Sequence, residues 1–284
     1  MKKRLILLFL ILLLILIFLN SNYIIKNIID YTYLFINNLF FYTFIIYVIT
    51  SLLIEYDLLS ILNPIHYINI MSLISGFPSG PKYIRDLYNK SIIDLETCNY
   101  LIYYNHYPNP LFVIGSISSI ISRKYSIYIL LSIYISNFII SRIYKNNNIS
   151  ISNNNYISNN SFSYNLTNSI YNSIKTIIII YGTSIISVII GLLITKYFYI
   201  NSIIYSITFG IFDLTKGIFS TTLIHNKRIS SILILLFISF GSISIHLQTK
   251  QILSDTDISY KNYLKGRFYS TFISIIIFIM MSSL

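Results

Sequence analysis

Residues Ile74 to Ser116 read ISGFPSGPKYIRDLYNKSIIDLETCNYLIYYNHYPNPLFVIGS, and the rest of the chain is organised around them. The stretch holds two breaks rich in glycine and proline, Gly76–Pro81 and Tyr107–Pro110, each beside strongly apolar sequence. Inside a bilayer, such a break frees amide and carbonyl groups that no water can satisfy, so it is tolerated only when buried in protein or lining a polar cavity. Transporters use broken helices to hold a substrate near the middle of the membrane. The alternative is a pair of ordinary turns outside the membrane.

The composition is that of a membrane protein with several spans. Of the 284 residues, 55% are hydrophobic and only 10% are charged, and the mean hydropathy is +0.70. A soluble domain carries roughly 25% charged residues. The 20 basic residues outnumber the 9 acidic ones, for a net charge of +11, but they lie between apolar runs. We therefore interpret them as orientation signals and contacts with the lipid bilayer, and we expect no nucleic-acid partner.

Nothing in the sequence indicates enzymatic chemistry. Cys98 is the single cysteine, which excludes an internal disulfide and a cysteine-ligated metal site. The motifs of phosphate-binding loops, zinc proteases and serine hydrolases do not occur. We expect no enzyme, no cofactor and no bound metal.

Residues 1–57 are expected to form N-terminal transmembrane helices. An apolar run, Leu5–Leu19, follows three basic residues, and no site with small residues follows it. This favours an uncleaved first helix with a cytoplasmic N-terminus over a signal peptide. A second span is expected at about Leu34–Ile54.

Residues 58–145 predict a hairpin followed by a broken helix. The arm Leu58–Ser75 is apolar, whereas the arm Pro81–Lys90 is polar enough that it should not face lipid. This contrast favours a re-entrant hairpin over two complete spans, with Ser79 as the N-cap of the second arm. The next helix begins near Asp94, is interrupted by the second break, and is followed by a full span.

The second half repeats this pattern. Residues 146–168, rich in Asn and Ser, predict a flexible loop, and residues 169–284 begin with another span. The apolar run Tyr197–Ile224 is too long for one span and too short for two, so we interpret it as a second re-entrant hairpin with Gly210–Gly217 at its tip. A helix broken at Gly241 follows. The expected fold class is an all-α polytopic membrane protein with two pseudo-symmetric halves, each a re-entrant hairpin followed by a broken helix.

Four segments occur in order: SGFPSGPK (Ser75–Lys82), NHYPNPLFVIG (Asn105–Gly115), FGIFDLTKG (Phe209–Gly217) and FGSISIHLQTKQILSDTDISYKNYLKGR (Phe240–Arg267). They resemble the signature segments of sporulation integral membrane proteins of the YlbJ (SpoVV) type. That family carries the nucleoside-recognition Gate domain and is related to concentrative nucleoside transporters. The resemblance covers most of residues 61–268, and it implies that residues 58–145 and 169–284 are two gate repeats.

The resemblance also implies a function. It indicates a membrane transporter or channel for a small polar anion, moving dipicolinic acid across the outer forespore membrane during sporulation. The implied location is the cell membrane or the outer forespore membrane. A nucleoside or nucleobase transporter, and a non-transporting membrane scaffold, stay open as alternatives. The family is expected to have Glu where Asp213 stands and a small residue where Leu247 stands, and these departures bear on the substrate more than on the fold.

We expect the hairpin tips and broken helices to converge on one site for a small-molecule substrate, either dipicolinate or a nucleoside-like compound. Helix N-termini after the breaks would favour an anion, and polar and aromatic side chains would complete the site. The residues predicted to bind substrate are Phe77, Ser79, Gly80, Asn105, Asn109, Asp213, Ser242, Ser244, His246 and Gln248.

Some of these residues have alternative roles. Asn105 and Asn109 could instead cap helix ends. Asp213 and Lys216, three residues apart, predict an ion pair on one helix face, and proton or ion coupling through Asp213 is the functional alternative. The sequence leaves open whether the chain forms a homo-oligomer.

Overall fold

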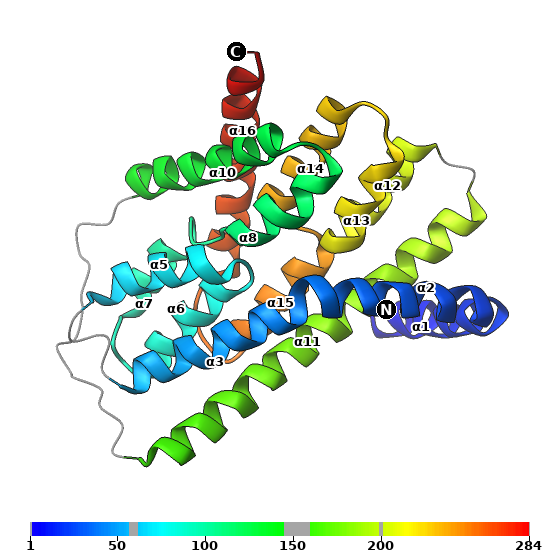
Figure 1. Cartoon of the computed structure of the whole chain (residues 1–284). Coiled ribbons are helices and arrows are strands. Elements are labelled where there is room, and N and C mark those ends of the chain that lie inside the picture. Colours follow the sequence, from blue (N-terminus) through cyan, green and yellow to red (C-terminus); the bar gives the residue numbers. More distant parts are fainter. Residues whose placement is uncertain (1, 57–61, 145–159, 199–200, 284) are drawn as a thin grey trace.

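The computed structural model describes residues 2–56, 62–144, 160–198 and 201–283, which form helices and connecting turns (Figure 1). The protein is all-α, as predicted. Five of the described helices are long and apolar enough to cross a membrane, which supports an integral membrane protein. They are Ser21–Glu55, Arg123–Ile143, Phe162–Tyr197, Lys227–Ile252 and Tyr260–Ser283.

Two long helices run antiparallel along one side of the molecule (Figure 1). The first is continuous through α2 (Ser21–Phe35), the π-helical turn η1 (Ile36–Phe40) and α3 (Phe41–Glu55), and the second is α11 (Phe162–Tyr197). Hydrogen bonds join them along their length. Ser51 bonds to Ser169 at 3.1 Å between the hydroxyl oxygens, and Thr32 bonds to Tyr181 at 2.6 Å. At 1.5 Å per residue each helix is roughly 50 Å long, more than the ~30 Å hydrocarbon core of a bilayer.

Helix α11 begins earlier than the sequence indicated. We expected a loop over residues 146–168, but the described part of that range is helical from Phe162 onward, and residues 145–159 lie outside the described residues. Ser161 caps the helix by accepting a hydrogen bond from the backbone N–H of Tyr164. Packing against α3 then stabilises polar sequence as helix, because a long-range contact overrides weak local propensity.

The first helix pair consists of α5 (Pro64–Ser75) and α6 (Ser79–Asn89), joined by Gly76, Phe77 and Pro78. Gly76 has φ +77°, and a Cβ atom added to it would lie 2.7 Å from the backbone nitrogen of Asn109, so the turn requires glycine. The predicted N-cap was wrong. Pro78 occupies that position, Ser79 is already helical, and the Ser79 hydroxyl donates to the carbonyl of Gly76.

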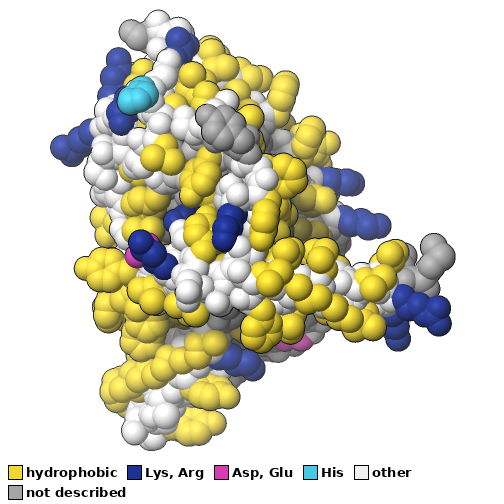
Figure 2. All heavy atoms as spheres, turned by 90° about the vertical axis from the view of Figure 1, so that its right-hand side faces the viewer, with side chains coloured by type: hydrophobic (Ala, Val, Ile, Leu, Met, Phe, Trp, Pro, Cys, Tyr) yellow, Lys and Arg dark blue, Asp and Glu magenta, His cyan; other side chains and the backbone are white. Residues whose placement is uncertain are grey.

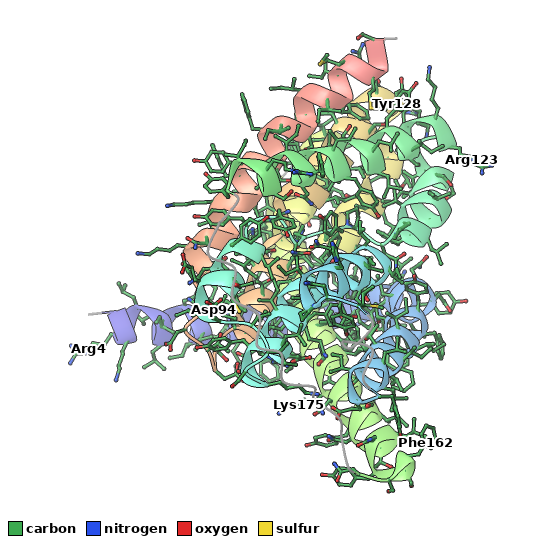
Figure 3. All side chains as sticks on the ribbon, turned by 90° about the vertical axis from the view of Figure 1, so that its left-hand side faces the viewer. Arg4, Asp94, Arg123, Tyr128, Phe162 and Lys175 are labelled. Carbon is green, nitrogen blue, oxygen red and sulfur yellow. The ribbon has the colours of Figure 1, made fainter. Side chains whose placement is uncertain are left out.

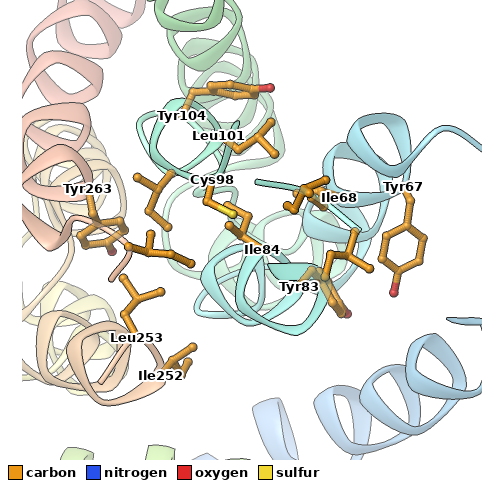
Figure 4. Packing of buried hydrophobic residues seen from close by; sticks show 14 of the residues in the cluster. Tyr67, Ile68, Tyr83, Ile84, Cys98, Leu101, Tyr104, Ile252, Leu253 and Tyr263 are labelled. Atoms are coloured by element: carbon orange, nitrogen blue, oxygen red, sulfur yellow. The ribbon is translucent and has the colours of Figure 1, made fainter. Parts of the chain in front are cut away.

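An apolar cluster holds this pair against α7 (Leu95–Leu101) and the C-terminal end of α15 (Ile243–Ile252). Figure 4 shows Ile68 and Ile84 of the pair lying beside Cys98 and Leu101, with Leu253 on the other side of the cluster. All of these side chains are buried. Burying a side chain of this size contributes about 1.5–3 kcal/mol, so the cluster fixes the position of the turn.

The helix after the first pair is broken, as predicted. Asp94 caps α7 by accepting a hydrogen bond from the N–H of Thr97 at 2.8 Å. The chain is not helical from Asn105 to Asn109. It then continues as α8 (Pro110–Phe112), the π-helical turn η2 (Val113–Ile117) and α9 (Ser118–Ile120), and α10 (Arg123–Ile143) follows.

The second helix pair consists of α12 (Ser202–Phe212) and α13 (Leu214–Ser220), with the short turn η3 (Thr221–Leu223) after it. The single residue Asp213 separates the two helices. They pack closely, because a Cβ atom added to Gly217 would lie 2.4 Å from the Cα atom of Gly210. The break therefore falls inside the predicted tip, Gly210–Gly217.

The last two helices complete the core. Helix α14 (Lys227–Phe240) ends at Gly241, which has φ +90°, and α15 (Ile243–Ile252) follows, so this break was predicted correctly. Helix α16 (Tyr260–Ser283) packs against α10 and α14.

Apolar side chains dominate the outer surface. They cover much of the face shown in Figure 2, where the basic side chains are scattered rather than gathered in one patch. The N-terminal helix α1 (Lys2–Leu19) has most of its leucines and isoleucines exposed, and Phe18 is 73% exposed. A soluble protein rarely exposes so large an apolar surface, whereas a lipid-facing helix does.

Candidate functional site

A cavity of about 200 Å³ lies where the helix breaks meet. One wall comes from the turns and helix starts of the two pairs and the two broken helices. The opposite wall comes from the long helices, through η1, α3 and α11. The breaks contribute Ser75, Gly76, Phe77, Pro78, Asn109, Leu111, Phe112, Ser116, Asp213, Leu214, Thr215, Ile245 and Gln248, and the long helices contribute Phe35, Asn37, Asn38, Leu39, Tyr42, Thr43, Ile177, Ile180 and Ser184.

Four of the residues predicted to bind substrate line this cavity, and they come from separate breaks. They are Phe77, Asn109, Asp213 and Gln248. Most of the cavity wall is apolar or uncharged. Among the described residues that line it, the carboxylate of Asp213 is the only charged group.

Asn109 is the N-cap of α8. Its Oδ1 atom accepts hydrogen bonds from the N–H groups of Leu111 at 2.8 Å and Phe112 at 3.2 Å. Its Nδ2 atom lies 3.5 Å from the carbonyl oxygen of Ser75, at the turn of the first pair. Asn109 therefore caps a helix and faces the cavity at once, so the two roles that the sequence left open are compatible.

Phe77 provides a flat aromatic wall. Its ring stacks on that of His106, with centroids 4.9 Å apart and an angle of 13° between the planes. His106 is buried and held in place by the hydroxyl of Tyr263, 3.1 Å from Nδ1. Phe77 is itself one of the residues that line the cavity.

Asp213 is the N-cap of α13 and is 1% exposed. Its Oδ1 accepts a hydrogen bond from the N–H of Lys216 at 2.9 Å, and its Oδ2 accepts one from the hydroxyl of Ser244 at 3.1 Å. A carboxylate at a helix N-terminus is stabilised by the partial positive charge of the free N–H groups. The bond to Ser244 also ties the second pair to the start of α15.

The predicted ion pair between Asp213 and Lys216 is wrong. Within the described residues the Lys216 ammonium makes no salt bridge with Asp213, and its Nζ atom lies 5.7 Å from the centre of the Phe209 ring. The reason is local. Asp213 has the extended conformation of an N-cap, with φ −139° and ψ 129°, so its side chain reaches the backbone of Lys216 rather than its ammonium.

Gln248 connects α15 to α11. Its Nε2 atom donates to the carbonyl oxygen of Ile180 at 3.3 Å and lies 3.4 Å from the hydroxyl of Ser184. The side chain is 1% exposed, and its Oε1 atom has no hydrogen-bond partner in the described part of the chain.

The other six predicted residues do not line the cavity. Ser79 bonds to its own turn, and the Nδ2 atom of Asn105 donates to the carbonyl of Leu101. Gly80 lies against the backbone of Asn105, because a Cβ atom added to Gly80 would lie 2.1 Å from the carbonyl oxygen of Asn105. Ser242 bonds to Ser244 at 2.8 Å between the hydroxyl oxygens.

His246 points away from the cavity, into an aromatic cluster with Tyr260 and Tyr263. Its Nδ1 atom lies 2.9 Å from the hydroxyl of Tyr260. The helical phase explains this, because Ile245 and Gln248, three residues apart on α15, face the cavity and place His246 on another side.

The sequence-based prediction did not include the residues of the long helices. Asn37 and Asn38 lie in the π-helical turn η1, and Ser116 lies in the second such turn, η2. The Ser116 hydroxyl donates to Oδ1 of Asn38 at 3.0 Å, so the two turns meet at the cavity. Single π-helical turns inside α-helices are frequent at functional sites. The available signal was the Asn37-Asn38 pair inside an otherwise apolar run.

Arg267 is a second residue that the prediction did not single out. It is fully buried in α16. It donates to the carbonyl oxygen of Tyr103 at 3.1 Å and reaches those of His106 and Ser239 at 3.5 Å. These carbonyls lie after α7 and at the end of α14, where helix dipoles are negative. Arg267 therefore holds the two broken helices together.

Comparison of the chain with protein-family models, with curated proteins and with solved structures gives no match. The resemblance to the YlbJ (SpoVV) type therefore stays a prediction.

Proposed function

We propose that this chain is a membrane transporter or channel for a small polar ring compound, held in the cavity where the helix breaks meet. One observation carries the proposal: turns and helix starts from four separate breaks line one cavity together with the two long helices. A scaffold that used its breaks only for packing would have no reason to bring Asn109, Asp213 and Gln248 to a shared cavity.

Helix lengths support re-entrant hairpins. The helices α5, α6, α12 and α13 have 12, 11, 11 and 7 residues. At 1.5 Å per residue the longest is roughly 18 Å, well short of a ~30 Å hydrocarbon core. A helix pair of this length in a membrane protein reaches about half-way and turns back.

The order of elements supports pseudo-symmetry between the halves. In the first half a long helix (Ser21–Glu55) precedes the pair α5 and α6, the broken helix α7 to α9, and the span α10. In the second half α11 precedes the pair α12 and α13, the broken helix α14 to α15, and the span α16. Repeats of this kind place a substrate site at their interface.

The charges of the lining favour a neutral ligand, such as a nucleoside or nucleobase. The anion prediction relied on free N–H groups at helix starts. At α8, two of these groups are bonded to the side chain of Asn109, whereas the starts of α6 and α15 have no side-chain cap. At α13 the cap is the carboxylate of Asp213, whose negative charge opposes an anion. Phe77 offers a face for stacking a flat ring, and uncharged amides and hydroxyls offer hydrogen bonds. Dipicolinic acid, which the resemblance implies, is the second candidate.

The test is uptake by proteoliposomes that contain the purified chain, with labelled uridine and labelled dipicolinate offered separately. We expect uridine uptake above that of empty liposomes and little dipicolinate uptake. Uptake of dipicolinate but not of uridine would show that the ligand is the anion rather than a neutral compound. Uptake of neither would favour the scaffold alternative and overturn the proposal.

A further inference from the structure

A second cavity, of about 550 Å³, lies next to the first one and is lined mainly by polar side chains. It is formed by the end of α3, by α6, by the N-terminal half of α11, and by the C-terminal half of α15 with the residues that follow it. Its lining includes Arg85, Asn89, Asn172, Lys175 and Gln251. We call this cavity the vestibule.

The vestibule belongs to one end of the molecule. Figure 3 shows Lys175 and Phe162 of α11 at the end opposite to Arg123 and Tyr128 of α10. Lys175, Asn172 and Gln251 are exposed. A polar cavity that reaches the surface holds water, whereas the first cavity is bounded mainly by apolar groups.

Of the residues that the structure describes, only Gln248 and Ile180 line both cavities. They are also bonded to each other, through the hydrogen bond from the Gln248 amide to the Ile180 carbonyl. The amide thus spans the gap between α15 and α11 and separates the two spaces. Its Oε1 atom is buried without a partner among the described residues, so only the Nε2 atom of the amide holds α15 to α11 at this point.

We infer that the vestibule is the aqueous access route to the first cavity, called the central cavity from here on, and that Gln248 is the gate between the two. Small hydrophilic molecules pass when the Gln248 amide leaves α11. This inference rests on the proposed function and names its route. The gating step is a rotation of the Gln248 side chain that breaks its hydrogen bond to α11.

The test uses thiol labelling rather than transport. In a Cys98→Ala background, Thr43→Cys places a reporter in the central cavity, and Thr176→Cys places one in the vestibule. An impermeant hydrophilic thiol reagent is added outside sealed proteoliposomes. Labelling of the vestibule reporter measures the fraction of molecules whose vestibule faces outward.

We expect the cavity reporter to react slowly while Gln248 is present and roughly tenfold faster in Gln248→Ala, because the hydrogen bonds that hold the gate closed are lost. Gln251→Ala is the matched control. It removes an amide from the same helix that lines only the vestibule, and it should leave the rate unchanged.

Gln248→Asn keeps the amide on a shorter side chain and should react at an intermediate rate, which separates gating from misfolding. The inference would be overturned if the cavity reporter reacted equally fast with Gln248 in place and with Gln248→Ala. It would also be overturned if Gln251→Ala accelerated the labelling as much as Gln248→Ala. Labelling as expected without uptake of any solute would instead leave the route standing and refute the proposed transport.

Discussion

At the tip of the first helix pair the chain reverses through Gly76, Phe77 and Pro78, whereas at the second tip Asp213 alone separates α12 from α13. The first tip depends on space. Gly76 has a positive φ and lies against the backbone of Asn109. The second tip depends on hydrogen bonding, because the buried carboxylate accepts from an N–H group and a hydroxyl. A turn beside the cavity can thus be stabilised by close packing or by a capping side chain, and the two tips should respond to different substitutions.

The largest expected effect is at the first tip. Gly76→Ala adds a Cβ atom 2.7 Å from the backbone nitrogen of Asn109 at a φ of +77°. Strain and overlap together should cost about 3 kcal/mol of stability. Thermal unfolding in detergent measures the loss. Gly115→Ala is the matched control, because no described atom beyond its chain neighbours and its own helix backbone lies within 4 Å of the added Cβ atom. Equal melting temperatures for the two variants would contradict the steric account.

The second tip should respond to charge and hydrogen bonding instead. Asp213→Ala leaves α13 without its cap and Ser244 without its acceptor, which should cost about 2 kcal/mol. Asp213→Asn keeps an acceptor for the N–H of Lys216, and we expect it to be tolerated within roughly 0.5 kcal/mol. The same unfolding assay measures both variants. If Asp213→Asn were as damaging as Asp213→Ala, the negative charge itself would be required.

A third comparison separates capping from substrate binding. Asn109→Ala should cost about 1 kcal/mol through the lost cap and should also reduce solute uptake. Asn226→Ala removes a cap of the same design from α14, since Asn226 accepts from the N–H groups of Arg228 and Ile229, but Asn226 does not line the cavity. We expect equal losses of stability and a loss of uptake in Asn109→Ala only. Equal uptake by both variants would make Asn109 purely structural.

The smallest effect should come from the contact between the long helix and the first tip. Tyr42 donates a hydrogen bond to the carbonyl oxygen of Ile74 at 3.1 Å. Tyr42→Phe should cost about 0.5 kcal/mol, because this bond is between neutral groups and is exposed. The exposed Tyr33 provides the control, as Tyr33→Phe should leave the melting temperature unchanged. A loss of 2 kcal/mol in Tyr42→Phe would indicate that the long helix holds the first tip more firmly than this bond explains.

Local chemistry was enough to predict much of the fold. Glycine readily takes the positive φ at which a helix ends, so the breaks at Gly76 and Gly241 were visible in the sequence. Helix caps are equally local, because the capping side chain and the N–H groups it accepts from are within three residues. The start of α7 near Asp94 was predicted because early acidic residues suit the positive end of the helix dipole, and Asp94 is the N-cap.

Tertiary structure decided which residues line the cavity. Asn38 and Ser184 face it because two long helices, more than a hundred residues apart in the chain, pack across the breaks. His246 is excluded from it by the helical phase of α15, and Arg267 is buried because carbonyl groups from two distant helix ends surround it. By itself the sequence determined where helices stop, since that depends on neighbours along the chain. Which polar groups meet depends on how the helices pack, and only the tertiary structure decides it.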